Sequence, residues 1–234
     1  MCWMTAESRQ DGAALRRCLE RVRKVGEPTS GGHAWGYAYL SDACETGEGR
    51  LICNWGTGAM PPSVEAKATE TDADVALAHT RFATRGAQTL QNAHPFPIRD
   101  ENGYTYAALC HNGTWYDAPT GFGDEHSDTY YLAKTVEEHF HEAGGVAALP
   151  PSAGGGDPDG PAFHDLLDPV LREIGETVLV LDRTGRVHTY AGRFTITMQR
   201  TEQGWTVASS GGRPVPKQAL ITDNDAAITA RVRS

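Results

Sequence analysis

The sequence predicts a single α+β domain built as a layered sandwich of helices and antiparallel strands. Its 234 residues are 39% hydrophobic, which is enough for one sizeable core, so residues 1–234 are expected to form one domain. Strand-like segments gather in two groups, one before residue 111 and one after residue 176, and two amphipathic helices lie between the groups. Helices between two groups of antiparallel strands are typical of a layered sandwich.

In the first half of the chain, a helix precedes a series of strands. Four apolar residues recur at helical spacing, which predicts a helix over 11–25 that ends at Gly26 and Pro28. This stripe consists of Leu15, Cys18, Leu19 and Val22. Runs of apolar, aromatic and small residues predict strands at 35–40, 51–55, 75–79 and 104–110, with the polar stretch 41–50 as a turn.

In the second half, two helices precede the second group of strands. Ser127 is a suitable N-cap for a helix over 128–143, whose apolar face carries Leu132, Val136 and Phe140. Residues 144–161 are rich in Gly, Pro, Ala and Asp and are expected to be a flexible insertion. A second helix over 166–174 should end at Gly175. A meander of antiparallel strands is expected at 177–181, 186–190, 195–200 and 205–209.

The charge and cysteine content exclude several classes of protein. The chain has 21 basic and 30 acidic residues, a net charge of −9, which argues against nucleic-acid binding. No apolar run reaches the ~20 residues of a membrane span, and the start lacks the apolar core of a secretory signal. No histidine or cysteine spacing indicates a metal site, so no metal or other cofactor is expected. The odd cysteine count without a CxxC pair predicts free thiols in a reducing cytoplasm; these are Cys2, Cys18, Cys44, Cys53 and Cys110.

Cys2, directly behind Met1, is the strongest chemical signal in the sequence. If Met1 is removed, Cys2 carries both a thiol nucleophile and a free α-amino group. An α-amino group has a pKa of about 8, so it can accept the thiol proton near neutral pH, and the thiolate is the reactive form. A cysteine at position 2 can also be accidental, so the prediction depends on the segments downstream of Cys2.

Four short segments lie downstream of Cys2 in a particular order. The His79 segment reads His-Thr-Arg-Phe-Ala-Thr-Arg-Gly and leads on to Asn92-Ala93-His94-Pro95-Phe96. The other three are Gly32-His33-Ala34-Trp35-Gly36-Tyr37-Ala38, Cys110-His111-Asn112-Gly113-Thr114 and Ser127-Asp128-Thr129. With Cys2 they resemble the class II glutamine amidotransferase domain, clearly to about Thr129 and by strand pattern to about Gly212. The resemblance implies the four-layer αββα sandwich of the amino-terminal-nucleophile (Ntn) hydrolases, with two antiparallel sheets between helix layers.

The resemblance also implies roles for individual residues. Cys2 is the nucleophile, and Asn112 with the backbone N–H of Gly113 forms the oxyanion hole. Arg81 binds the α-carboxylate of glutamine, which its planar guanidinium suits, and Asp128 binds the α-ammonium. The remaining residues, expected to line the glutamine pocket, are Thr84, Arg85 and Gly86.

Each of these assignments has a simpler structural alternative. Arg81 could form an ordinary ion pair, Asn112-Gly113 is a common hairpin turn, and Asp128 is a favoured first-turn helix acid. The sequence also departs from the family at two positions. Arg85 replaces a histidine that is common there, and Trp3 replaces a glycine that often follows the nucleophile.

The expected function is that of a stand-alone glutaminase or glutamine amidotransferase subunit. It would hydrolyse the side-chain amide of glutamine through a Cys2 thioester and release ammonia to a separate acceptor enzyme, since the chain has no room for a synthase domain. Two alternatives remain open. One is a γ-glutamyl amidohydrolase of the same fold that acts on a γ-glutamyl conjugate, and the other is a regulatory subunit without activity. No nucleic-acid or membrane partner is expected.

Overall fold

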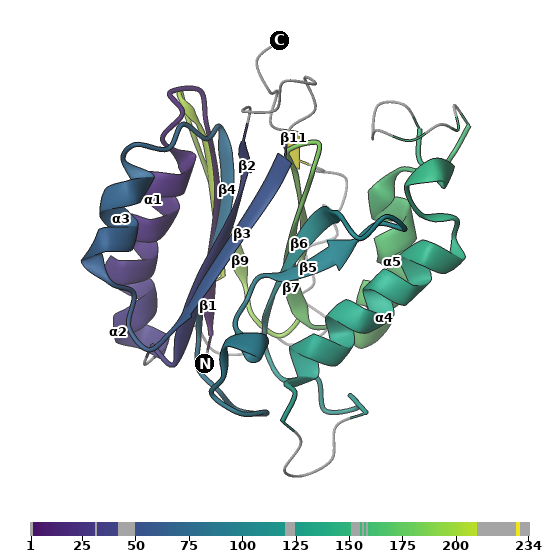
Figure 1. The fold of residues 1–234 in the computed structure, drawn as a ribbon, viewed down its shortest axis with the longest axis horizontal. Helices are drawn as coiled ribbons and strands as arrows, with labels where there is room; N and C mark the ends of the chain where they lie inside the picture. The colour runs from purple at the N-terminus through teal and green to yellow at the C-terminus, as the bar shows by residue number, and fades with distance from the viewer. Residues whose placement is uncertain are drawn as a thin grey trace.

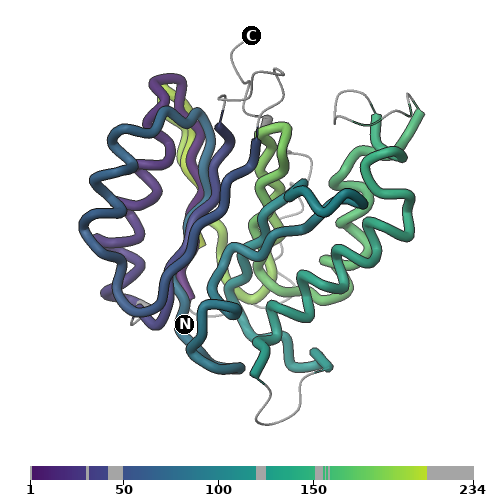
Figure 2. Tube along the Cα trace, in the orientation of Figure 1, coloured from purple at the N-terminus to yellow at the C-terminus, as the bar shows by residue number. Residues whose placement is uncertain are grey.

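The computed structural model describes residues 2–30, 32–41, 50–119, 125–150, 155, 157, 159–209 and 228–229. They form four layers in the order helix, sheet, sheet, helix (Figure 1). The Cα trace shows the same arrangement, with two sheets face to face and a helix layer outside each (Figure 2). The predicted α+β class and the four-layer αββα sandwich are therefore confirmed.

The first sheet has six antiparallel strands and carries the start of the chain near its centre. Its order is β3-β2-β4-β1-β10-β9. The bounds are β1 Trp3–Arg9, β2 Ala34–Ser41, β3 Arg50–Thr57, β4 Val75–Arg81, β9 Ile196–Thr201 and β10 Gly204–Ser209. In the register, Trp3 lies opposite Thr80 of β4 and Thr5 lies opposite Ala208 of β10. Cys2 therefore enters the sheet beside the end of β4.

The second sheet has five antiparallel strands in the order β11-β8-β7-β6-β5. The bounds are β5 Phe96–Arg99, β6 Thr105–Asn112, β7 Thr177–Asp182, β8 Arg186–Tyr190 and β11 Ile228–Thr229. The strands predicted at 75–79 and 104–110 extend further than expected, since β4 continues to Arg81 and β6 continues to Asn112. β4 pairs with β1 and β2, and β6 pairs with β7. These pairings continue to Arg81 of β4 and to Asn112 of β6.

The first helix layer comprises α1 Ala14–Arg21, the π-helical η1 Val22–Gly26, α2 Glu27–Ser30 and α3 Pro62–Ala68. The prediction that Gly26 and Pro28 end the first helix is wrong, since the chain stays helical to Ser30. The wider π turn is closed by the Glu27 N–H donating to Val22 O, and Pro28 then lies in the first turn of α2, where its missing N–H costs little. Gly26 is needed because a Cβ there would lie 2.9 Å from the Trp3 ring.

The second helix layer comprises α4 Asp128–Glu142, the short 3₁₀ helix η3 Gly145–Ala148 and α5 Phe163–Ile174. The Ser127 hydroxyl accepts a hydrogen bond from Tyr130 N, and Gly175 closes α5 with a φ of 65°, so both predicted helices, the N-cap of α4 and the end of α5 are confirmed. α5 begins at Phe163, three residues before the predicted start at 166. The expected insertion 144–161 contains η3, and its residues 151–154, 156 and 158 lie outside the described part of the chain.

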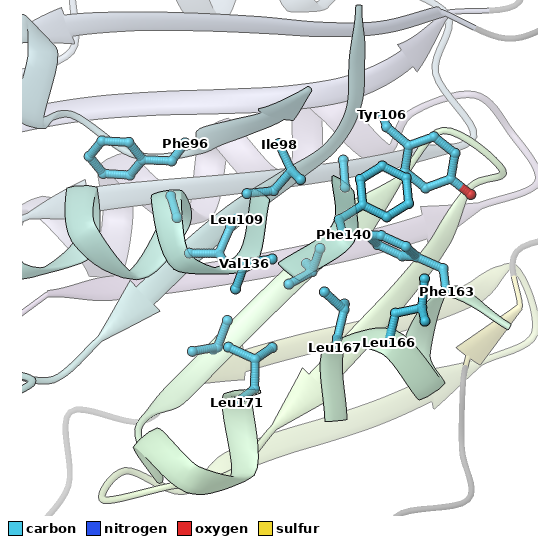
Figure 3. Close-up of a cluster of buried hydrophobic side chains, with 14 of the residues drawn as sticks. Phe96, Ile98, Tyr106, Leu109, Val136, Phe140, Phe163, Leu166, Leu167 and Leu171 are labelled. Atoms are coloured by element: carbon cyan, nitrogen blue, oxygen red, sulfur yellow. The ribbon is translucent and has the colours of Figure 1, made fainter. Parts of the chain in front are cut away.

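Three apolar clusters hold the layers together. One lies between the sheets and includes Met4, Leu77 and Leu179, and another joins α1 to the first sheet through Leu15, Leu19 and Ala76. The third joins α4 and α5 to the second sheet (Figure 3). In it, the rings of Tyr106, Phe140 and Phe163 pack at centroid distances of 4.8 to 5.4 Å. Each amphipathic helix thus covers one face of one sheet.

The predicted strand meander at 177–209 is divided between two sheets. β7 and β8 pair in the second sheet, whereas β9 and β10 pair in the first, where β10 joins β1. The strands β1, β5 and β11 and the helix α3 were not expected from the sequence pattern. Of the polar stretch 41–50, expected to be a turn, residues 42–49 lie outside the described residues, while Ser41 and Arg50 belong to the paired strands β2 and β3.

The described cysteines Cys2, Cys18, Cys53 and Cys110 are free thiols, as expected, and Cys44 lies outside the described residues. Among the residues that the structure describes, no helix is long and apolar enough to cross a membrane. No cluster of potential metal ligands is found in that same part of the chain.

Candidate active site

The predicted site residues come from the ends of three strands and the start of one helix. β1 begins beside the end of β4, and β6 ends at Asn112. At the lower end of the sandwich in Figure 1, the start of β1 lies near the segment that follows β4 and near the start of α4. Segments that are far apart in the sequence therefore meet at one end of the two sheets.

Cys2 is partly buried against the backbone of Phe82, the residue that follows β4. The Phe82 N–H donates to the Cys2 sulfur at 3.4 Å, and the sulfur lies 3.6 Å from Phe82 O. Burial raises the pKa of the Cys2 thiol; the Phe82 N–H and the charge of Arg81 oppose this shift, and the Asp128 carboxylate adds to it. Cys2 is therefore a protonated thiol near neutral pH, and a base is needed to activate it.

Arg81 is 3% exposed and is held by the loop that follows it. Its guanidinium donates to Arg85 O at 2.6 Å and to Ala87 O at 3.1 Å. Burial lowers its pKa, and the charges of Cys2 and Asp128 raise it. These two bonds use only part of the five-donor fork, so N–H groups remain for a bound anion.

Asp128 is the first residue of α4 and is 4% exposed. One carboxylate oxygen accepts from its neighbour Thr129 N at 3.0 Å, and the other accepts from Trp115 N at 2.8 Å. The second bond ties the start of the helix to the loop that follows Gly113. The charge of Asp128 influences the pKa values of both Cys2 and Arg81, so the three groups form one electrostatic cluster.

The expected pocket-lining residues form a loop packed against the segment after β6. The Thr84 and Thr114 hydroxyls lie 3.3 Å apart, and Arg85 donates to Trp115 O at 3.4 Å. Gly86 has a φ of +71°, and a Cβ there would come within 2.6 Å of Ser127 N. Only glycine allows this approach, which brings the Arg81 loop to the start of α4.

Asn112 lies further inside the sandwich than Cys2. It is fully buried, and its side-chain amide donates to Ser209 Oγ at 3.0 Å. The Ser209 hydroxyl also accepts from Met4 N at 3.2 Å, which connects Asn112 to the strand that begins behind Cys2. The Asn112 Oδ1 has no hydrogen-bond partner among the described residues.

Gly113 lies against the buried carboxylate of Glu176. Its φ is +154°, and a Cβ there would lie 2.2 Å from Glu176 Oε2 and 2.9 Å from His111 Nε2. Glu176 itself binds Arg193 at 3.1 Å, and its Oε2 has no hydrogen-bond partner among the described residues. Glu176 was not expected near the site, because a glutamate before a strand carries no recognisable signal in a sequence.

Three histidines outside the predicted site residues support this region. His33 accepts from Ala83 N at 3.0 Å and stacks on Phe82, which braces the backbone that holds Cys2. His79 contacts His111 O at 3.2 Å and stacks on His94. Burial lowers the pKa of His79 to about 3 and that of His94 well below its usual range, so both are neutral packing groups near neutral pH.

A cavity of about 650 Å³ opens between residues 89–97 and α4. It is lined mainly by aromatic and apolar side chains, among them Trp55, Phe96 and Tyr130. None of the predicted site residues lines it, so this cavity is separate from the predicted site.

Comparisons with known proteins give similarity at the level of structure. No family model matches the chain, and no curated protein matches its sequence. A glutamine phosphoribosylpyrophosphate amidotransferase from B. subtilis, solved with ADP and GMP, matches 89% of this chain at 13% identity with a TM-score of 0.51, and the chain spans 41% of that protein's length. A glutamine aminotransferase class-II domain protein from Silicibacter pomeroyi matches 92% of this chain and 91% of its own, at 13% identity and a TM-score of 0.48. At 13% identity the first of these matches shows the fold alone, so the chain shares its αββα fold with the part of that glutamine amidotransferase that it covers.

Proposed function

We propose that this chain is an amidohydrolase that uses Cys2 to hydrolyse the side-chain amide of glutamine to glutamate and ammonia. The observation that carries the proposal is the convergence of one thiol, one buried guanidinium and one buried carboxylate. Cys2, Arg81 and Asp128 come from three separate segments, and the charges of Arg81 and Asp128 both act on the pKa of the Cys2 thiol. A cation and an anion beside a thiol match the carboxylate and ammonium groups of an amino-acid substrate.

The raised pKa of Cys2 explains why the nucleophile needs its own base. After removal of Met1, the free amine of Cys2 takes the thiol proton, directly or through a water. The thiolate then attacks the carboxamide carbon to form a tetrahedral intermediate. The intermediate collapses as the C–N bond breaks, and the nitrogen takes the proton from the amine and leaves as ammonia. Water then hydrolyses the γ-glutamyl thioester, which gives glutamate and restores the thiol.

The other site residues divide into two roles. Arg81 and Asp128 hold the α-carboxylate and the α-ammonium, and the loop of Thr84, Arg85 and Gly86 closes over the bound amino acid. Asn112 and the Gly113 N–H stabilise the negative oxygen of the tetrahedral intermediate. The Asn112 amide nitrogen carries two N–H donors and the bond to Ser209 uses one of them, so the second is the donor proposed for the oxyanion.

A γ-glutamyl conjugate is the alternative substrate, since it keeps the same amino-acid head group. Direct comparison of free glutamine with a γ-glutamyl amide separates the two by kcat/KM. The released ammonia is proposed to pass to a separate acceptor enzyme in the cytoplasm. A regulatory role without activity remains the alternative to both enzymes and predicts no turnover of either substrate.

The test uses protein whose amino terminus has been sequenced. Turnover of glutamine should require a free Cys2, and Cys2→Ala should abolish it, whereas Cys18→Ala should keep it because Cys18 is a fully buried thiol in the helix layer. The glutamine analogue 6-diazo-5-oxonorleucine should label Cys2 alone. Asp128→Asn should mainly raise KM. Full activity with Met1 retained, or in Cys2→Ala, refutes the mechanism.

A further inference from the structure

Asn92 occupies an unusual position between the two residues proposed to hold the substrate's head group. It lies in the short 3₁₀ helix η2 Leu90–Asn92 and is fully buried. Both the nitrogen and the oxygen of its side-chain amide form hydrogen bonds. The Nδ2 group donates to Ala87 O at 3.0 Å and to Glu125 O at 2.5 Å, and Oδ1 accepts from Ser127 N at 2.8 Å.

One end of the Asn92 amide leads directly to Arg81. The Ala87 carbonyl that accepts from Asn92 also accepts from the Arg81 guanidinium at 3.1 Å. A carbonyl oxygen has two lone pairs, so it can hold both donors at once. The position of this carbonyl, and with it the position of the guanidinium, is therefore set in part by Asn92.

The other end of the amide leads to Asp128. Ser127, whose N–H binds Asn92, is the N-cap of α4, and Asp128 is the next residue. The Ala87 N–H also donates to Glu125 O at 3.1 Å, which ties the same two segments together through their backbones. Gly86 allows the close approach that these bonds require.

From these contacts we propose that Asn92 is a positioning residue that fixes the spacing between Arg81 and Asp128. The inference rests on the proposed function. The α-ammonium and α-carboxylate of an amino acid are attached to one carbon, so their separation is fixed, and a site binds both groups at full strength only when its cation and anion match that separation. A misplacement of about 1 Å in such a site can cost on the order of 10²-fold in rate.

An amide is the side chain that suits this position. It donates and accepts at the same time, whereas an aspartate has no donor for the Ala87 and Glu125 carbonyls and an alanine has neither group. Asn92→Asp should keep the bond to Ser127 N and lose the bonds to Ala87 O and Glu125 O. Comparison of the two variants therefore separates the loss of the amide donor, which reaches Arg81 through Ala87 O, from the loss of the acceptor that holds Ser127 N next to Asp128.

A residue that only stabilises a loop would weaken the fold without changing which head group is preferred. The readout is therefore the ratio of the constants with which two ligands inhibit glutamine hydrolysis. One is L-glutamate, which has both head-group charges. The second ligand lacks one of them, either glutarate without the amine or 4-aminobutyrate without the α-carboxylate.

The control is Asp100→Ala. Asp100 is also buried, and its carboxylate also fixes a loop, since it accepts from Asn102 N at 2.9 Å and Tyr104 N at 2.8 Å on the turn between β5 and β6. This turn contains none of the proposed site residues. Thermal unfolding of each variant establishes that it is folded before ligands are compared.

In the wild type, each missing charge should weaken binding. In Asn92→Ala both ratios should shrink by about tenfold or more, and in Asn92→Asp the loss should fall mainly on the α-carboxylate ratio, because Arg81 is the arm affected. Asp100→Ala should keep both wild-type ratios. Wild-type ratios in folded Asn92→Ala or Asn92→Asp overturn this inference alone, whereas a wild type that does not distinguish the ligands overturns the proposed function and the inference with it.

Discussion

At the scale of single residues, the environment of Cys2 determines the chemistry that this site can perform. A partly buried thiol that accepts one backbone N–H lies close to both a cation and an anion, and its pKa is raised. Reactive cysteines that rely on a preformed thiolate have a lowered pKa instead. Reactivity at Cys2 must therefore come from proton removal during the reaction.

The first prediction concerns the pH dependence of this step. The unprotonated fraction of an α-amine rises through a pKa of about 8, and the raised thiol pKa leaves little thiolate below that pH. The kcat/KM for glutamine should therefore rise as the pH increases from 6 to 8.5. Alkylation of Cys2 by iodoacetamide should accelerate over the same interval, and the Cys2→Ala variant reports the background. A Cys2 that alkylates at full rate at pH 6 would contradict this assignment.

The second prediction concerns Asn112, whose amide is fully buried and bound to Ser209. If this amide stabilises the tetrahedral intermediate, Asn112→Ala should lower kcat by about 10²–10³ with little change in KM. Steady-state kinetics on protein shown to be folded by circular dichroism measure both parameters. A change in KM alone would mean that Asn112 contacts the ground state, and the oxyanion assignment would be wrong.

At the scale of elements, the sequence predicted α4 and α5 well and β1 not at all. Both helices have clear apolar stripes. α4 begins after a recognisable N-cap, Ser127, and α5 ends at a recognisable C-cap, Gly175. β1 is buried on both faces, yet it carries Thr5 and Glu7, and the Glu7 carboxylate is accommodated only because Arg21 of α1 binds it at 2.6 Å. A partner from a different element cannot be read from a local pattern, so the strand appeared too polar to be buried.

The loop after β4 gives a prediction at this scale. Gly86 and Gly103 both have positive φ, at +71° and +82°, but a Cβ at Gly86 would meet the backbone of residues 126 and 127, whereas nothing lies within 4 Å at Gly103. Gly103→Ala should therefore cost only the strain of its backbone conformation, on the order of 1–2 kcal/mol. Gly86→Ala should destabilise the protein by more than that and also raise KM for glutamine. Urea unfolding and kinetics on both variants test this, and equal effects would show that the close approach has no importance.

At the scale of the whole molecule, the candidate site depends on contacts that cross between layers and segments. The motif order in the sequence was enough to predict the αββα fold and to choose Cys2, Arg81, Asp128 and Asn112. It included Asn92 without a role and did not reach Ser209 or Glu176, because the contacts of these residues lie 5 to 97 residues away along the chain or depend on an exact loop approach. The residue type in a motif can be read from the sequence, whereas the contacts that hold it in place are visible only in the fold.

The buried histidines between the layers give a prediction for the stability of the whole fold. His79, with a pKa lowered to about 3, and His94, lowered further, stay neutral in the native state, whereas in the unfolded chain they take up protons below a pH of about 6.5. Their contribution to the free energy of unfolding is fully present above that pH. It is lost as the pH falls, by up to about 1.4 kcal/mol per pH unit for each histidine. Urea unfolding at pH 7.5, 6 and 5 should show this loss. His94→Gln should make the dependence shallower, and a flat profile from pH 7.5 to 5 in the wild type would contradict the assignment.

The central place of β1 has a practical consequence for handling the protein. Because Cys2 directly precedes β1 and its sulfur lies against the backbone of Phe82, a residue joined ahead of Cys2 begins immediately next to the thiol. An affinity tag or fusion partner at that end would occupy the space next to the thiol and would also block its amine. Purification schemes should therefore either place the tag elsewhere or use a protease that leaves cysteine as the first residue.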